Sequence, residues 1–146
     1  MNASAGPGPS AVISCLAYRD ARGAIDWLCR VIGFSTRQLY EGPDNTVAHA
    51  ELTLGGGMIM LGTVKDSEYG RLVRPPEEFG GLGTQSIFVV VPDADEVYGR
   101  AKASGARIAI ELKTEAYGRG FSCFDPEGHL WNIGTYDPWQ TPPAQA

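Results

Sequence analysis

Strand-like and helix-like patterns of apolar residues alternate along the first part of the chain. Residues 12–18 form a short, mainly apolar run that predicts a strand. Asp20 follows at a position suited to capping a helix. Four apolar residues then recur with the i, i+3, i+4, i+7 spacing of one helix face: Ile25, Leu28, Cys29 and Ile32. Gly33 stands where this helix should end, because glycine adopts a positive φ at little cost.

Three more strands are predicted after this helix. Their apolar or alternating segments are residues 34–40, 47–54 and 58–61. Turn-forming residues separate them, with Gly, Pro, Asp and Asn at 41–45 and three glycines at 55–57. The first part of the chain therefore has the order strand, helix, strand, strand, strand, written here as βαβββ.

The same order returns in the second part of the chain. A strand at 85–91 precedes a helix that Asp93 or Asp95 caps and Gly105 ends. The inner face of this helix is formed by Ala94, Val97, Tyr98 and Ala101. The last three strands are residues 107–112, 120–124 and 130–136. Asp20 and Asp93, which lie 73 positions apart, open equivalent helices, so the chain is an internal repeat of one supersecondary unit.

The repeat predicts an α+β fold of two βαβββ modules, at residues 11–63 and 85–137. Each module has a curved sheet with its helix on one face only, so the other faces form a concave surface that suits a small molecule. Residues 1–10 and 138–146 are expected to be tails. The segment 64–84, rich in proline and glycine, joins the modules. It is either a plain linker or a linker that also covers the mouth of the pocket.

Composition and net charge limit the classes of function that this chain can have. The 146 residues are 43% hydrophobic and 20% charged, which is enough to build a core. The net charge of −5 argues against non-specific binding to nucleic acid or to an anionic membrane. No apolar run approaches the roughly 18 residues of a membrane span, and residues 1–10 lack the pattern of a signal peptide. Three cysteines without metal-site spacing are typical of a reducing compartment, so a cytoplasmic location is expected.

Several segments of the chain together resemble one known family. They are residues 18–21, 24–28 and 32–34 of the first module, and residues 89–95, 103–106, 117–120 and 125–131 of the second. The most specific is the last, which reads Asp-Pro-Glu-Gly-His-Leu-Trp. With these motifs the chain resembles the vicinal-oxygen-chelate superfamily, which includes glyoxalases, extradiol dioxygenases and bleomycin-resistance proteins. The resemblance implies paired βαβββ modules around a concave pocket, usually in a homodimer.

The resemblance also tells where a metal ion would be held. Metal-dependent members use a His, Gln or Glu side chain on the first, fourth, fifth and eighth strands. Aligned by the motifs, these positions are Ile13, Met60, Ser86 and Asn132. Ile13 and Met60 are unsuited to a hard or borderline divalent ion, and Ser86 is a poor ligand. A slip of one residue offers only Gln85, so we predict no metal and no other cofactor.

The two histidines of the chain belong to different settings. In the strand 47–54, alternation places Val47, His49 and Glu51 on one face. His49 and Glu51 therefore form a weak two-ligand metal pair, a polar pair that contacts a ligand, or, as the favoured interpretation, part of a solvated strand face. His129 belongs to the turn motif, where hydrogen bonding that holds the turn is the favoured role.

Aromatic residues gather near the last strands and suggest a stacking surface. The candidate ligand-binding residues are His49, Glu51, Met60, Ser86, Tyr117, Arg119, Trp131 and Tyr136. Arg119 is a possible anion-binding group, or else the partner of a surface carboxylate. For Trp131, packing in the core is the alternative.

Two functions follow from this set, and the sequence leaves both open. The first is a metal-free protein that sequesters a small planar or cationic molecule, as a drug-resistance protein of this superfamily does. The second is an enzyme, either a glyoxalase-like lyase or isomerase with a degenerate metal site, or a metal-free catalyst with Glu51 as its base. No catalytic residue is assigned from the sequence.

Overall fold

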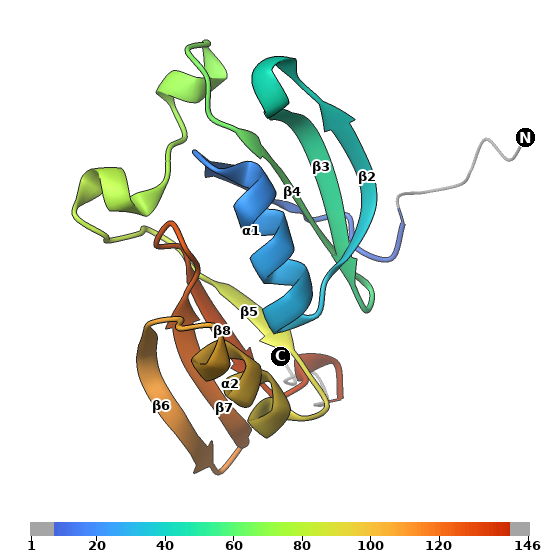
Figure 1. Cartoon of the computed structure of the whole chain (residues 1–146). Helices are drawn as coiled ribbons and strands as arrows, with labels where there is room; N and C mark the ends of the chain where they lie inside the picture. Colours follow the sequence, from blue (N-terminus) through green and yellow to red (C-terminus); the bar gives the residue numbers. More distant parts are fainter. Residues whose placement is uncertain (1–7, 141–146) are drawn as a thin grey trace, which may run out of the picture.

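The computed structural model describes residues 8–140 and contains the two predicted modules (Figure 1). The first module consists of β1 (Ser14–Tyr18), α1 (Ala21–Trp27), β2 (Ser35–Glu41), β3 (Val47–Leu54) and β4 (Gly57–Thr63). The second consists of β5 (Ile87–Val90), α2 (Ala94–Ala103), β6 (Ile108–Glu115), β7 (Gly118–Phe124) and β8 (Leu130–Gly134). The predicted tails fall largely at residues 1–7 and 141–146, outside the described part. No helix in residues 8–140 is long and apolar enough to cross a membrane.

The two modules share one sheet topology. The strand orders are β1-β4-β3-β2 and β5-β8-β7-β6, in two separate four-stranded sheets. In each sheet the first strand runs parallel to the last one and the other pairs are antiparallel. The α+β fold of two βαβββ modules is therefore confirmed. Cys15 is the partner of Met60, and Phe88 the partner of Asn132, so Met60 and Asn132 occupy equivalent positions.

Asp20 and Asp93 cap the two helices as predicted. The Asp20 side chain accepts a hydrogen bond from the Gly23 amide at 3.0 Å, and the Asp93 side chain accepts one from the Glu96 amide at 3.1 Å. Gly33 follows the first helix with φ at +111°. Asp95, the alternative cap, lies inside α2.

Two local irregularities change which residues face the core. The first helix continues as a π-helical segment over Leu28–Ile32. Its wider turns shift the buried face, so Val31 is buried and Cys29 only half-buried. In β3, Glu41 pairs with Val47 while Tyr40 pairs with His49, which makes Ala48 an inserted bulge residue. The prediction that Val47 shares a face with His49 is therefore wrong, and Val47 is buried in the core.

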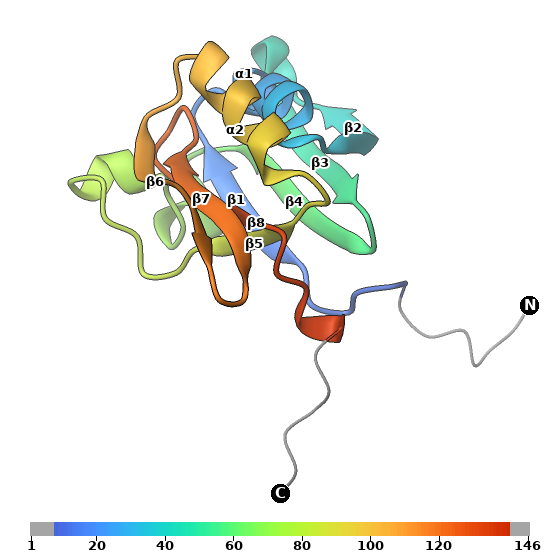
Figure 2. The same ribbon diagram turned by 90° about the horizontal axis from the view of Figure 1, so that it is seen from below.

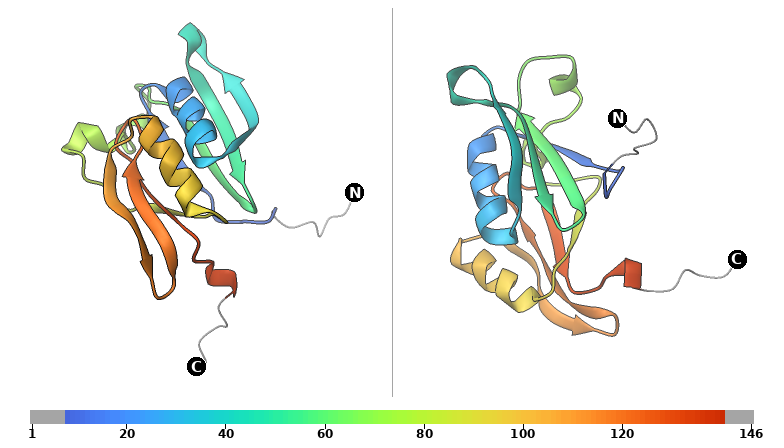
Figure 3. Two further views of the ribbon diagram at one scale, coloured as in Figure 1. Left: turned by 60° about the horizontal axis from the view of Figure 1, so that its bottom comes forward. Right: turned by 90° about the vertical axis from the view of Figure 1, so that its right-hand side faces the viewer.

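The helices of the two modules pack against each other. In the left view of Figure 3, α1 and α2 lie side by side between the strands of the first module and those of the second, and Figure 2 shows the same neighbourhood from below. The Trp27 indole donates a hydrogen bond to the Ser104 hydroxyl at 3.2 Å, and the Arg100 guanidinium donates one to the Val31 carbonyl at 2.9 Å. One hydrophobic core includes buried residues of both modules. The modules therefore form one folded unit through their helical sides.

A buried carboxylate joins the second module to the first. Asp125 Oδ2 accepts hydrogen bonds from the Tyr18 hydroxyl at 2.6 Å and from the Trp131 indole at 3.0 Å. Its Oδ1 accepts from the backbone amides of Glu127 and His129, at 3.0 and 3.1 Å. All four donors point at a carboxylate that is 5% exposed. Burial of this charge is tolerated because each oxygen has two donors.

Glu127 and His129, in the same turn as Asp125, also contact the first module. The Glu127 side chain accepts hydrogen bonds from the backbone amides of Arg19 at 2.5 Å and Asp20 at 2.7 Å. The His129 ring bonds to the Ala17 carbonyl at 3.0 Å and lies 4.9 Å from the Tyr18 ring. The sequence favoured hydrogen bonding that holds the turn as the role of His129. The ring hydrogen bond to β1 agrees with that role, and it connects this turn to the first module.

Replacing the buried carboxylate tests its importance. In Asp125→Asn an amide NH2 takes the place of one oxygen and faces two donors, whichever way it is oriented. We expect the free energy of unfolding in urea to fall by about 2–4 kcal/mol. The exposed Asp26, which pairs with Arg30 four residues further along, provides the control, and Asp26→Asn should cost about 0.5 kcal/mol. Equal losses in the two variants would contradict the role given to Asp125.

Alkaline pH should also destabilise the fold. Burial, and then the charge of Asp125, raises the pKa of Tyr18 well above its ordinary value and that of Cys123 to about 12. Both groups are neutral in the folded and unfolded states below about pH 8, so their contribution is complete there. As pH rises toward 12 the unfolded chain loses these protons first, and stability falls by about 1.4 kcal/mol per pH unit for each group. Urea unfolding between pH 8 and 11 measures this slope, which Cys123→Ala should reduce.

Candidate functional site

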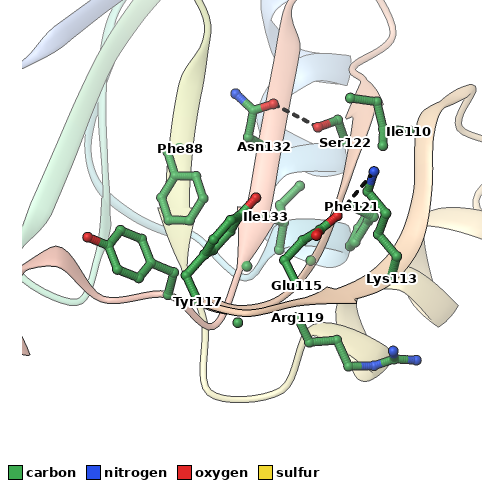
Figure 4. A pocket seen from close by; sticks show the side chains of 14 residues that line it. Phe88, Ile110, Lys113, Glu115, Tyr117, Arg119, Phe121, Ser122, Asn132 and Ile133 are labelled. Atoms are coloured by element: carbon green, nitrogen blue, oxygen red, sulfur yellow. Dashed lines mark hydrogen bonds and ion pairs between the residues drawn. The ribbon is translucent and has the colours of Figure 1, made fainter.

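Each sheet has a face that no helix covers, and each of these open faces carries a cavity. The cavity on the second sheet has a volume of about 330 Å³. Residues of β5, β6, β7 and β8 line it (Figure 4). Gly120 and Gly134 are paired across β7 and β8, so the floor has no side chains at that point. A Cβ on Gly120 would lie 2.6 Å from the Ile133 carbonyl oxygen, which explains why the floor needs glycine there.

Aromatic side chains form the walls of this cavity. Tyr117, from the turn between β6 and β7, contacts Tyr136 with ring centroids 5.7 Å apart and an edge-to-face angle of 72°. Phe88 comes from β5, and its ring lies against Gly134. Tyr117 is 67% exposed and Phe88 46% exposed, so both rings offer free surface. These three rings surround a space where a flat molecule has aromatic neighbours.

A row of hydrogen-bonded polar groups crosses the sheet beside these rings. The Ser122 hydroxyl donates to Asn132 Oδ1 at 2.7 Å, a contact drawn in Figure 4. The Asn132 amide donates in turn to the Ser86 hydroxyl at 2.9 Å. Asn132 is therefore oriented by its neighbours, while the Ser86 hydroxyl keeps a proton to donate.

The charged residues around this cavity are all in ion pairs. Lys113 and Glu115 are paired at 3.3 Å. The Arg119 guanidinium makes two hydrogen bonds to Asp95 on α2, at 2.8 and 3.0 Å, and in Figure 4 it points away from the cavity. This contact lowers the pKa of Asp95 and raises that of Arg119. Of the two sequence interpretations of Arg119, the structure shows the pair with a surface carboxylate.

The second cavity, of about 400 Å³, lies on the open face of the first sheet. Cys15, His49 and Met60 line it from the strands. Lys65 and Tyr69, from the segment that joins the modules, line it too. The joining segment therefore forms part of a cavity wall.

The eight predicted ligand-binding residues are divided between these places. His49 and Met60 line the first-sheet cavity, and Glu51 lies beside them, paired with His49 at 3.1 Å and with Arg37 at 3.4 Å. Tyr117 and Tyr136 line the second-sheet cavity, Arg119 borders it with its guanidinium turned away toward Asp95, and Ser86 contacts it through Asn132. Trp131 is 0% exposed and donates to Asp125 in the core, so we leave it out of the ligand-binding set.

Many lining residues were missed in the sequence. Phe88 and Ile110 line the second-sheet cavity, and Cys15 lines the first-sheet cavity. A signal for Phe88 was present, because Val89 is buried and its neighbours Phe88 and Val90 face the other side. This alternation cannot be detected in the sequence, because all four residues of β5 are apolar and both faces of the strand therefore have the same pattern.

The donor atoms at the four positions where metal-dependent members of the superfamily hold a metal show whether a divalent ion would fit there. Met60 and Asn132 are in equivalent registers, and Asn132 Oδ1 already accepts from Ser122. The four side chains at these positions offer a hydrocarbon, a thioether, a hydroxyl and one amide oxygen, which do not fit Zn²⁺, Ni²⁺ or Fe²⁺. Within residues 8–140, no three His, Cys, Asp or Glu side chains are grouped for a metal ion.

Comparisons of this chain with family models and with solved structures agree on one family. The family model described as Glyoxalase/Bleomycin resistance protein/Dioxygenase superfamily matches residues 11–133. No match was found among curated proteins. Among solved structures, TioX from Micromonospora sp. ML1 is 31% identical, with 88% of this chain and 99% of that chain covered and a TM-score of 0.65.

Two more distant structures share the fold. A glyoxalase/bleomycin resistance protein from Streptomyces sp. CB03234 is 17% identical, with 86% of this chain and 99% of that chain covered and a TM-score of 0.62. A mutant of glyoxalase I from Zea mays is 15% identical, with 84% of this chain and 44% of that chain covered and a TM-score of 0.65. The match of the family model over most of the chain, together with this fold, establishes that the chain belongs to the Glyoxalase/Bleomycin resistance protein/Dioxygenase superfamily.

Proposed function

We propose that this protein binds a small planar molecule in the cavity of the second sheet, without a divalent metal ion, and so sequesters it. The observation that carries the proposal is the set of three partly exposed rings, Phe88, Tyr117 and Tyr136, around a floor without side chains. The unsuitable donors at the four metal positions support the metal-free form of this activity. Resistance to a drug is the biological role that such binding serves in the superfamily.

The size and charge of the cavity support a flat ligand held by stacking. A volume of about 330 Å³ suits a molecule of two or three fused rings. Each stacked aromatic contact contributes about 0.5–1.5 kcal/mol beyond burial. Because Lys113 and Arg119 each have an acidic partner, ionic attraction contributes less than stacking and a hydrogen bond from Ser86.

We propose further that the protein is a homodimer. The helical sides of the modules pack together within one chain, so the apolar side chains of the open faces remain exposed, including Phe88, Val90 and Ile110. A second copy that covers these faces would bury them and enclose the cavities.

The cysteines Cys15, Cys29 and Cys123 are all free thiols, which supports a cytoplasmic location.

An enzyme is the second candidate, and the His49–Glu51 pair in the first-sheet cavity favours it. Glu51 would be the base that removes a proton from a bound substrate, as a metal-free counterpart of a glyoxalase-like lyase or isomerase. Its carboxylate, however, also contacts Arg37. Proton NMR after incubation with the hemithioacetal of methylglyoxal and glutathione distinguishes the two candidates, because an isomerase converts this substrate into a thioester of the same mass, whereas the binding protein returns it unchanged.

Stacking is tested with fluorescence titration of acridine, which is neutral, and 9-aminoacridine, which is cationic. Tyr117→Ala and Phe88→Ala should each weaken binding of both probes by about 2- to 12-fold, the range that one aromatic contact provides. Trp139→Ala is the control, because Trp139 is 93% exposed and does not line the cavity, and its affinity should be unchanged. The absence of saturable binding by any of several planar probes would contradict the proposal.

The oligomeric state is measured by light scattering at micromolar concentration. We expect the mass of a dimer for the native chain and a shift toward monomer for Ile110→Glu, which places a charge on the open face. Val12→Glu changes an exposed apolar residue outside both cavities and should leave the dimer intact. A native chain that is monomeric at this concentration would refute the dimer.

A further inference from the structure

A third cavity, of about 380 Å³, lies where both modules and the segment that joins them meet. It is lined by Trp27 of the first module, by Glu77 of the joining segment, and by Arg107 and Phe124 of the second module. We propose that this cavity binds a small monocarboxylate with an aromatic or other apolar body, and that Arg107 holds the carboxylate group. This site is distinct from the planar-ligand site of the second sheet and does not depend on it.

Arg107 differs from the other arginines in its lack of an acidic partner. Every other arginine in residues 8–140 forms an ion pair with an Asp or Glu side chain. Over the same range no carboxylate is paired with the exposed Arg107. A guanidinium presents its N–H donors in a planar fork that matches the two oxygens of a carboxylate. The charge and the donors of Arg107 are therefore available to an anionic ligand.

The ring of Phe124 orients the Arg107 guanidinium. The central carbon of the guanidinium, Cζ, lies 3.8 Å from the ring centroid. The two residues are neighbours across β6 and β7, because the Phe124 amide donates a hydrogen bond to the Arg107 carbonyl at 3.0 Å. Stacking covers one face of the guanidinium and leaves the N–H groups at its edge accessible. A side chain held in this way loses less conformational freedom when it binds a carboxylate.

Much of the remaining lining is apolar surface, or polar groups that already have partners. The Trp27 indole donates to the Ser104 hydroxyl at 3.2 Å, and this hydroxyl donates to the Ala101 carbonyl at 2.7 Å. The protons of Trp27 and Ser104 are therefore both in use. Ala106 and Pro126 add apolar surface to the lining. Because small-molecule sites combine apolar walls with a few polar groups, the cavity suits a ligand with an apolar body and one charged end.

The charges around the cavity favour a ligand with a single negative charge. Glu77 is paired with Arg19. Asp125 also lines the cavity, but it is 5% exposed and its oxygens already accept hydrogen bonds from four donors. Arg107 is thus the one unpaired charge of the lining, and it compensates one carboxylate. A phosphate dianion would bring a second negative charge close to Asp125, where like charges repel each other.

The test is an NMR titration of the full chain with 2-naphthoate, and with 2-naphthamide, which has nearly the same shape and no charge. We expect saturable amide shifts at Gly105, Ala106 and Arg107 with 2-naphthoate, and affinity for 2-naphthamide about 10-fold lower, the share of a hydrogen-bonded ion pair. Inorganic phosphate should bind more weakly than 2-naphthoate. Equal affinity for the two naphthyl probes, tighter binding of phosphate, or 2-naphthoate shifts confined to the second-sheet cavity would each overturn the proposal.

Variants of Arg107 test the anion-binding side chain. Arg107→Gln should lower the affinity for 2-naphthoate about 10-fold. Arg107→Lys should lower it less, because an ammonium group keeps the charge and loses the planar fork.

Arg30→Gln is the matched control, because it removes the same charge from an exposed arginine outside the cavity, and its affinity should be that of the native chain. Thermal unfolding shows that each variant is folded, and acridine affinity should be native in Arg107→Gln. Native affinity for 2-naphthoate in folded Arg107→Gln, or an equal loss in Arg30→Gln, would refute the site. An equal loss of acridine affinity in Arg107→Gln would contradict a site separate from that of the second sheet.

Discussion

The buried carboxylate of Asp125 is the interaction on which the arrangement of the two modules depends. One side chain accepts two hydrogen bonds from its own turn, one from Trp131 in the second module and one from Tyr18 in the first. A buried charge is costly unless every oxygen is satisfied, so the pieces that supply the donors must come together in one geometry. The Asp-Pro-Glu-Gly-His turn is therefore a structural element, and its charged residues are used in the core.

The polar side chains of this turn are all engaged in hydrogen bonds. Asp125, Glu127 and His129 have partners within the turn, in the core or among residues 17–20 of the first module. The open faces of the sheets keep the accessible side chains instead, with rings and a serine–asparagine row on the second sheet and sulfur and imidazole groups on the first. Equivalent positions of one repeated unit thus offer different chemistry, as Met60 and Asn132 show.

Much of the fold was predictable because it follows local rules. Capping aspartates, glycines after helices and alternating strands recur with one spacing, and the structure has these features at Asp20 and Asp93. The bulge at Ala48 was not predictable, because the residue inserted in a strand is chosen by its partner strand. The orientation of Trp131 and of Phe88 was not predictable for the same reason. Trp131 faces the core and Phe88 the cavity, and only the register of β5 and β8 decides this.

We propose that the open face of the second sheet binds a planar molecule without a divalent metal. Amide chemical shifts recorded during an acridine titration, with and without EDTA, test it most directly. We expect shifts at Phe88, Ser122 and Asn132, the same in both titrations, and none at Val97 on the inner side of α2. Shifts that vanish with EDTA, or that centre on the helical side, would contradict it.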